Sequence, residues 1–176
     1  MSDLVERAMV FAANAHGGIG QVRKYTGEPY INHPIEVMEL VKTAAHFSDD
    51  MLAAALLHDT VEDTPVTQED IERVFGPSVA SLVHELTDQC HVGNRATRKS
   101  AEAARPATIS PEAQTVKLAD LISNSRSILE HDPGFARVYI QEKARVLEVM
   151  TAGDASLYRQ ARMMIASSTK TAPTPT

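Results

Sequence analysis

Apolar residues recur at helical spacing along most of the chain. From Leu4 to Ala15, and again from Pro34 to His46, they lie three or four positions apart, which is typical of one face of an α-helix. No segment alternates apolar and polar residues over several strand lengths, and aromatic residues make up only 5% of the chain, which fits a sheet core poorly. The pattern therefore predicts an all-α protein.

Capping residues predict further helices in the middle of the chain. Asp49 or Asp50 can cap a helix that runs through MLAAALLHD. Thr67 and Asp70 resemble a capping box, in which each side chain bonds to the other residue's backbone N–H. The string GPS then interrupts the chain, and SVASLVHEL is predicted to form the next helix.

The last third of the chain is predicted to hold three helices. Ser110 can act as a cap, with Pro111 at the first helical position and Glu112 in the first turn. We expect this helix to reach Glu130, where the string DPG ends it. Two more helices are expected to follow, as far as about Ala166.

The length of 176 residues suits a single domain. We expect this domain to span residues 1–168. Residues 169–176 are rich in Thr and Pro and lack large apolar residues, which predicts a disordered tail. The single cysteine, Cys90, cannot form an internal disulfide and is expected to be a small buried apolar residue.

Charge and hydropathy narrow the class of partner. The net charge of −6 argues against a nonspecific binder of DNA or RNA, but it leaves room for a small phosphate ligand in a local basic pocket. Asp3 and Glu6 lie where a signal peptide would be basic, and the longest apolar run, Met51 to Leu57, is too short to span a bilayer. We therefore expect a cytoplasmic protein that binds neither a nucleic-acid polymer nor a membrane.

One group of ionisable residues follows the most apolar helix. The string MLAAALL is apolar on every face, as in a buried helix, and His58 and Asp59 come directly after it. Glu62 and Asp63 follow one turn later. Four ionisable groups at the end of a buried helix need partners, unless this end is solvated.

A second carboxylate lies inside an apolar helix. In VKLADLISNSRSI, Asp120 has apolar neighbours, and Asn124 lies one turn later on the same side. Such a carboxylate needs a metal, or an ion pair with Lys117 or Arg126. His33, just before a helix-starting proline, is on its own typical of a core or capping histidine.

Together these residues form a set of two imidazoles and two carboxylates. Mixed nitrogen and oxygen ligands suit Mn²⁺, Fe²⁺, Co²⁺ or Zn²⁺, whereas Ca²⁺ prefers oxygen alone. Such a metal can acidify water and polarise a phosphoryl oxygen, and the acids one turn later can orient or deprotonate that water. The set therefore predicts metal-dependent hydrolysis of a phosphate ester or anhydride.

Cations for a phosphorylated substrate lie in two places. Arg23 and Lys24 are in a Gly-rich stretch before His33, and a basic cluster runs from Arg95 to Arg105. Arg and Lys commonly neutralise phosphoryl groups. For any one of these residues, a solvated surface charge is the competing interpretation.

Three strings resemble the HD-domain phosphohydrolases, and more narrowly the hydrolase domain of RelA/SpoT-type alarmone enzymes. They are GQVRKYTGEPYINHP, AAALLHDTVEDT and VKLADLISNSRSI, in the family's order. The resemblance covers about residues 4–150, so the chain is similar to the stand-alone small alarmone hydrolases, whose relatives include the animal Mesh enzymes. It implies one domain of about eight to ten helices.

The resemblance also implies a site and a reaction. It assigns Mn²⁺ as the cofactor and four residues as its ligands: His33, His58, Asp59 and Asp120. It makes Glu62 and Asp63 the catalytic pair, and Arg23, Lys24 and Asn124 the residues that hold the nucleotide. The implied reaction removes the 3′-pyrophosphate of ppGpp or pppGpp, leaving GDP or GTP.

The chain departs from the family pattern near Asp120, and other functions stay open. Leu121 replaces the usual Arg or Lys, and Ser123 replaces an aromatic residue or His, which puts the pocket wall and the base preference in doubt. The alternatives are an NADPH 2′-phosphatase, another small-nucleotide phosphohydrolase, or a catalytically silent nucleotide-binding module. A homo-oligomer is compatible with each of them.

Overall fold

The computed structural model describes residues 2–87 and 104–170, and every regular element in these ranges is helical. The first half contains α1 (Asp3–Gly18), α2 (Asn32–Val41), α3 (Asp49–Leu57), α4 (Thr60–Asp63), α5 (Gln68–Phe75) and α6 (Pro77–Leu86). The second half contains η1 (Arg105–Ala107), α8 (Pro111–His131), α9 (Pro133–Val149) and α10 (Ala155–Lys170). The prediction of an all-α fold is confirmed.

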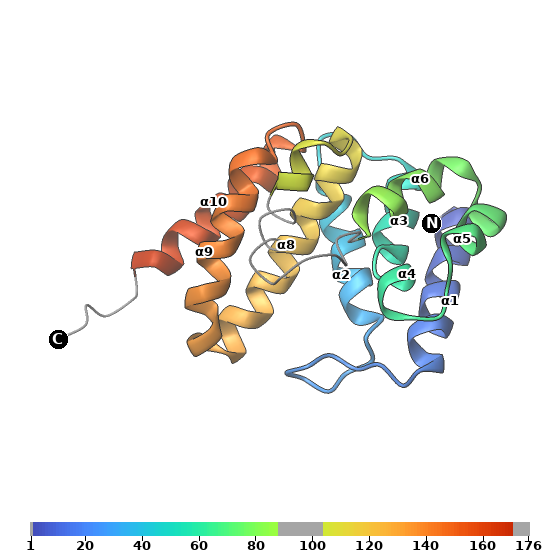
Figure 1. The fold of residues 1–176 in the computed structure, drawn as a ribbon, viewed down its shortest axis with the longest axis horizontal. Helices are drawn as coiled ribbons and strands as arrows, with labels where there is room; N and C mark the ends of the chain where they lie inside the picture. Colours follow the sequence, from blue (N-terminus) through green and yellow to red (C-terminus); the bar gives the residue numbers. More distant parts are fainter. Residues whose placement is uncertain (1, 88–103, 171–176) are drawn as a thin grey trace.

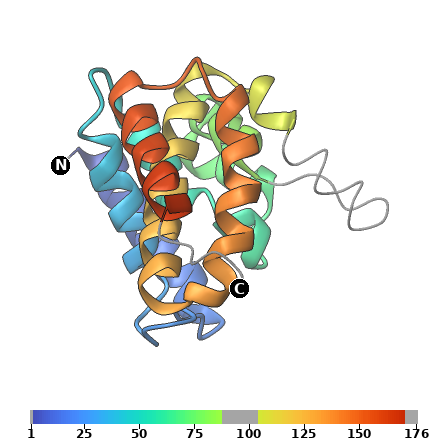
Figure 2. The same ribbon diagram turned by 90° about the vertical axis from the view of Figure 1, so that its left-hand side faces the viewer.

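Two helices form the centre of the bundle. Helix α3 packs against α1, α2, α6 and α8, and each of its residues from Met51 to Leu57 is buried, as its uniformly apolar sequence predicts. Helix α8 lies between α2 and α3 on one side and α9 and α10 on the other (Figures 1 and 2). The end of α3 and the middle of α8 therefore carry the predicted chemistry into the interior.

The start of α3 differs from the prediction. Ser48, rather than Asp49 or Asp50, is the cap, because its backbone is extended and its Oγ accepts the N–H of Met51 at 3.2 Å. Both aspartates lie in the first turn, where their charge interacts favourably with the helix dipole. Helix α2 also ends at Val41, earlier than the expected His46.

Three other predicted helix boundaries agree with the structure, whereas α2 begins at Asn32, two residues before the expected Pro34. Thr67 and Asp70 form a complete capping box at the start of α5. Ser110 caps α8, with its Oγ accepting the N–H of Ala113. Asp132 both ends α8 and caps α9, so the DPG string makes a sharp turn between two antiparallel neighbours.

The C-terminal helix extends past the expected domain boundary. Helix α10 runs to Lys170, so residues 169 and 170 are helical, and the rest of the predicted tail lies outside the described residues. Cys90, Arg95, Arg98 and Lys99 lie outside them as well. No helix of the described part is long and apolar enough to cross a membrane.

Candidate metal centre

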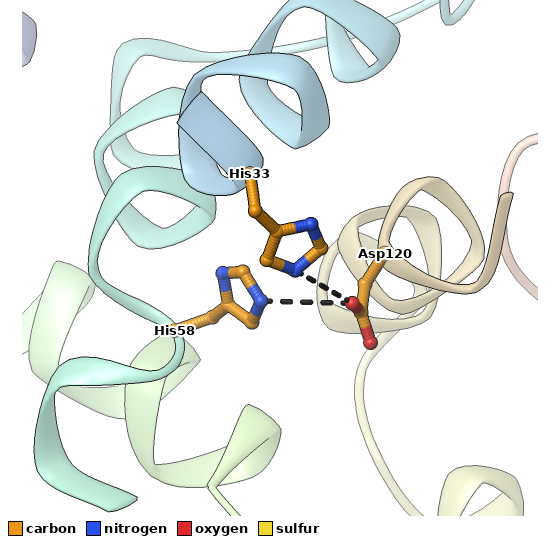
Figure 3. A group of neighbouring side chains, drawn as sticks. All are labelled: His33, His58 and Asp120. Carbon is orange, nitrogen blue, oxygen red and sulfur yellow. Dashed lines mark ion pairs between the residues drawn. The ribbon is translucent and has the colours of Figure 1, made fainter. Parts of the chain in front are cut away.

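Three helices bring the predicted ligands together. His33 lies in the first turn of α2, His58 follows the last residue of α3, and Asp120 lies within α8. Figure 3 shows the two imidazoles pointing at the carboxylate of Asp120. Their ligand atoms all lie within 4.8 Å of one another, which makes these three residues a candidate metal site in the described part of the chain.

Asp59 adds a second carboxylate to this centre. Its Oδ2 lies 3.1 Å from Nε2 of His58 and 3.7 Å from Nε2 of His33. Oδ1 of Asp120 lies 3.2 Å from Nε2 of His33 and 3.7 Å from Nε2 of His58. Asp59 therefore lies beside both imidazoles, whereas the group whose ligand atoms all lie within 4.8 Å of one another consists of His33, His58 and Asp120.

The burial of this centre fits a cation. The rings of His33 and His58 are almost wholly buried, and neither Nε2 has a hydrogen-bond partner of acceptable geometry among the described residues. Burying a polar atom without a partner costs free energy. A cation bound between the two imidazoles and the two carboxylates would explain why both Nε2 atoms are buried there. The nitrogen and oxygen donors suit a divalent transition metal.

The orientation of the His58 ring is set by the backbone. Its Nδ1 lies 2.8 Å from the carbonyl oxygen of Ala55, one turn earlier. A carbonyl can only accept a hydrogen bond, so Nδ1 carries a proton and Nε2 is the nitrogen that remains for a metal. The helix end thus fixes both the position and the tautomer of the neutral ring.

Tyr30 holds the carboxylate of Asp59. The phenol donates a hydrogen bond of 2.6 Å to Oδ2 of Asp59. Burial and the nearby carboxylate of Asp59 raise the pKa of Tyr30 far above its ordinary value, so the phenol stays protonated and remains a donor. The sequence did not predict this role, although Tyr30 belongs to the string GQVRKYTGEPYINHP.

The charges of the centre stabilise one another. Burial alone would lower the pKa of His58, but the carboxylates of Asp59 and Asp120 raise it well above its ordinary value. Burial would likewise raise the pKa of Asp120, but the facing imidazoles of His33 and His58 and the charge of Lys117 lower it. Burial would also raise the pKa of Asp59, but the charge of His58 lowers it, so both carboxyl groups are held in the anionic form that a metal requires.

Asp120 both forms an ion pair and faces the candidate metal site, which are the two explanations that the sequence left open for its carboxylate. Nζ of Lys117 lies 3.7 Å from Oδ2 of Asp120, while the imidazoles face Oδ1. Arg126 pairs with Glu36 instead. Asp120 therefore has both the ion pair and the position of a metal ligand, on different oxygens.

The predicted catalytic acids lie directly beside this centre in the chain. Glu62 and Asp63 belong to α4, the short helix that starts after Asp59, and both are exposed. Oδ2 of Asp63 accepts a hydrogen bond of 2.8 Å from the amide of Gln21, whose Oε1 in turn lies 2.6 Å from Nδ1 of His16. Gln21 therefore orients Asp63, a contact that the sequence alone did not suggest.

The predicted substrate residues lie in different surroundings. Nδ2 of Asn124 donates to Oδ1 of Asp120 at 2.6 Å. Nζ of Lys24 is 3.9 Å from Oδ2 of Asp132 and lies over the ring of Tyr25. Arg105, the described member of the basic cluster, donates to carbonyl oxygens at the end of α6, which is a structural contact.

Arg23 lines a cavity that one of the candidate ligands, His33, also lines. The cavity has a volume of about 270 Å³, and its lining includes Arg23, Asn32, His33, Ser123, Arg126 and His131. Leu121 packs in the hydrophobic core, so of the two departures from the family pattern only Ser123 lies at this wall.

The family follows from comparison with known proteins. Residues 8–147 match the family model described as HD domain, so the chain belongs to the HD-domain family. Two similar proteins carry the name guanosine-3′,5′-bis(diphosphate) 3′-pyrophosphohydrolase MESH1. The Mus musculus protein is 42% identical over 135 residues, which cover 75% of this chain and 74% of that protein. The Drosophila melanogaster protein is 41% identical over 106 residues, covering 60% of this chain and 59% of that one.

A solved structure resembles the whole fold. It is described as a metazoan ortholog of SpoT that hydrolyses ppGpp and plays a role in starvation responses, and it matches with a TM-score of 0.86 and 30% identity. The match covers 95% of this chain and 96% of that one. A Danio rerio protein that is also named MESH1 is 40% identical over 118 residues. The alignments with the Drosophila and Danio rerio proteins span 59% and 65% of the lengths of those proteins, less than two thirds in each case.

Proposed function

We propose that the chain is a divalent-metal-dependent hydrolase that removes the 3′-pyrophosphate of ppGpp or pppGpp. The observation that carries the proposal is the pair of buried, unpaired Nε2 atoms of His33 and His58 that face two carboxylates. This arrangement is joined to an exposed acidic pair on the next helix. The named activities of the similar proteins agree with this chemistry.

The metal would be held by His33, His58, Asp59 and Asp120, and Mn²⁺ is the proposed ion. When bound, it supplies polarisation of a phosphoryl oxygen and lowers the pKa of the attacking water. The chain's own residues supply the rest. Tyr30 holds Asp59, the carbonyl of Ala55 holds His58, and the buried walls keep the imidazoles out of bulk water.

The bond changes follow from the products. The oxygen of water attacks the phosphorus attached to the 3′ oxygen, the bond between this phosphorus and the 3′ oxygen breaks, and the water oxygen becomes part of the released pyrophosphate. A proton passes from the water to Glu62 or Asp63, and the departing 3′ oxygen of GDP or GTP takes up a proton from solvent. The exposed α4 carboxylates suit this exchange because they can return their proton to solvent.

The nucleotide would be held by cations and by an amide. Arg23 lines the cavity beside His33, and Lys24 lies one residue further along the same loop. Lys24 is already near Asp132, so a substrate phosphate would compete with that weak, exposed pair. Asn124 would contact the nucleotide through its Oδ1 and the second hydrogen of its Nδ2, which the hydrogen bond to Asp120 leaves available.

Product analysis tests the proposal. The purified chain is freed of metal, reconstituted with Mn²⁺ and incubated with ppGpp and, separately, with NADPH. Pyrophosphate and GDP from ppGpp are expected, and the activity should vanish in His58→Ala. Phosphate from NADPH with intact ppGpp would reassign the substrate. Metal and nucleotide binding without turnover of either compound would identify a catalytically silent module instead.

A further inference from the structure

Ser123 occupies a position between the candidate metal centre and a surface ion pair. It lies on α8 and is wholly buried. Its Oγ is 2.9 Å from Nδ1 of His33 on one side and donates to Oε2 of Glu36 at 2.7 Å on the other. Ser123 therefore links the imidazole of His33 to the carboxylate of Glu36, which lies one turn later on α2.

The direction of both hydrogen bonds follows from the number of protons. A serine hydroxyl has one hydrogen, and the carboxylate of Glu36 can only accept. If that hydrogen points to Glu36, Oγ can interact with His33 only as an acceptor. Nδ1 of His33 must then carry the proton, and in the neutral ring Nε2 keeps its lone pair toward Asp120 and Asp59.

Arg126 fixes the outer end of this chain of contacts. Its Nη1 lies 3.1 Å from Oε1 of Glu36, which leaves Oε2 for the serine. The two side chains of this pair are about two-fifths exposed, whereas Ser123 and His33 are buried. The guanidinium orients the carboxylate of Glu36, so that Oε2 faces the hydroxyl of Ser123.

We infer that Ser123 is a positioning residue that fixes the tautomer and ring orientation of His33 for metal binding. His58 needs no such residue, because a backbone carbonyl does the same for it. Partners of this kind typically change metal affinity 10–100-fold when they are removed. The inference rests on the proposed metal site, but it does not depend on which nucleotide is hydrolysed.

The chain offers a matched control for the test. Ser125 lies on the same helix and is also wholly buried, and its Oγ has no hydrogen-bond partner among the residues that the structure describes. Ser123→Ala and Ser125→Ala therefore delete the same atoms from similar surroundings, but only the first breaks the contact with His33. Glu36→Ala is a milder second variant, because it removes the acceptor from a partly exposed position.

The first readout is nitrogen NMR of the metal-free protein, labelled at histidine nitrogens. The signal of His33 is identified by its loss in His33→Gln. Wild type and Ser125→Ala should show a directly bonded, slowly exchanging proton on Nδ1 of His33. In Ser123→Ala this proton should exchange rapidly or move to Nε2. An unprotonated Nδ1 in the wild type, or an unchanged signal in Ser123→Ala, overturns the inference.

The second readout is Mn²⁺ affinity by titration calorimetry, with unfolding followed in parallel. We expect Ser123→Ala to bind about 10–100-fold more weakly than Ser125→Ala, with a smaller loss in Glu36→Ala. Equal affinities in the two serine variants overturn the inference. Because neither readout uses turnover, a wild type that leaves ppGpp intact refutes the proposed function without affecting this result.

Discussion

Nε2 of His33 lies 3.2 Å from Oδ1 of Asp120, so an imidazole from the start of α2 meets a carboxylate from the middle of α8. Neither residue would take this position for packing alone, since one brings an unpaired nitrogen and the other a charge into the interior. The contact makes metal content the first property to be tested by mutation.

Deleting a candidate ligand should remove the metal. Asp120→Asn and His58→Ala each take away one donor from the centre, so both should lose stoichiometric Mn²⁺ in elemental analysis after gel filtration. His46→Ala is the matched histidine control, because His46 is exposed and outside the centre. Full metal content in Asp120→Asn would show that Asp120 is not a ligand.

Removing the metal should lower the thermal stability of the wild type. A ligand that binds only the folded state stabilises it by about 2.7 kcal/mol at a hundred times its Kd. We therefore expect the melting temperature to fall on chelation and to rise with added Mn²⁺. The same titration should leave His58→Ala unchanged, and a response there equal to that of the wild type would place the binding elsewhere.

Glu62→Gln should separate catalysis from metal binding. The change keeps the shape of the side chain but removes its capacity to accept a proton. We expect kcat to fall by about 10²–10⁴-fold, as for loss of a general base, with Mn²⁺ content unchanged. Glu69→Gln, an exposed position on α5, is the control. Wild-type turnover in Glu62→Gln would leave Asp63 as the sole candidate base.

Asp154 should make stability depend on pH. Partial burial would raise its pKa, but backbone N–H donors of Leu157, Ala45 and Ser156 hold it below its ordinary value. A carboxyl with a lowered folded pKa stabilises the fold above its unfolded pKa, about 3.9, and loses this effect as pH falls through the folded pKa.

The corresponding variant is Asp154→Asn, which keeps a capping side chain but removes the charge. We expect it to cost about 1 kcal/mol near neutral pH, with the difference from the wild type shrinking as the pH falls below the unfolded pKa of Asp154. Urea unfolding of the metal-free proteins at several pH values measures it. A difference that does not change with pH would mean that the charge of Asp154 contributes nothing.

Gly153→Ala should destabilise the fold through a steric conflict. A Cβ on Gly153 would lie 2.8 Å from Cδ1 of Leu118 and 3.1 Å from the carbonyl carbon of Gln114. Since that backbone belongs to the central helix α8, we expect a loss of about 1–3 kcal/mol. Gly134→Ala is the control, because its Cβ would meet only an oxygen of Asp132 at 3.8 Å. Equal stability of the two variants would contradict the predicted conflict.

The sequence predicted the parts of the fold that depend on local chemistry. The uniformly apolar string before His58 predicted a buried helix, and the Thr67–Asp70 box predicted a helix start, because both signals act within one or two turns. The cap of α3 was missed because Ser48 and the two aspartates after it are all good capping residues. Backbone conformation decided among them.

The candidate ligands were predictable because ionisable residues among apolar ones are conspicuous. Tyr30, Gln21 and Ser123 gave no such signal, since each is common in positions without function. Their roles depend on partners far away in the chain, such as Asp63 for Gln21 and His33 for Ser123. These pairings arise only when α1, α2, α4 and α8 have packed.

The loop that carries Arg23 and Lys24 is fastened at its tip. The phenol of Tyr25 donates to Oδ2 of Asp132 at 3.0 Å, and its ring stacks on His131 with 5.7 Å between ring centroids. These contacts join the loop to the turn between α8 and α9. Immobilising a flexible segment normally reduces affinity, because conformational entropy is lost on binding. Here the contacts of Tyr25 already order the loop when the protein folds. A nucleotide would therefore bind a preorganised loop and lose less conformational entropy on binding.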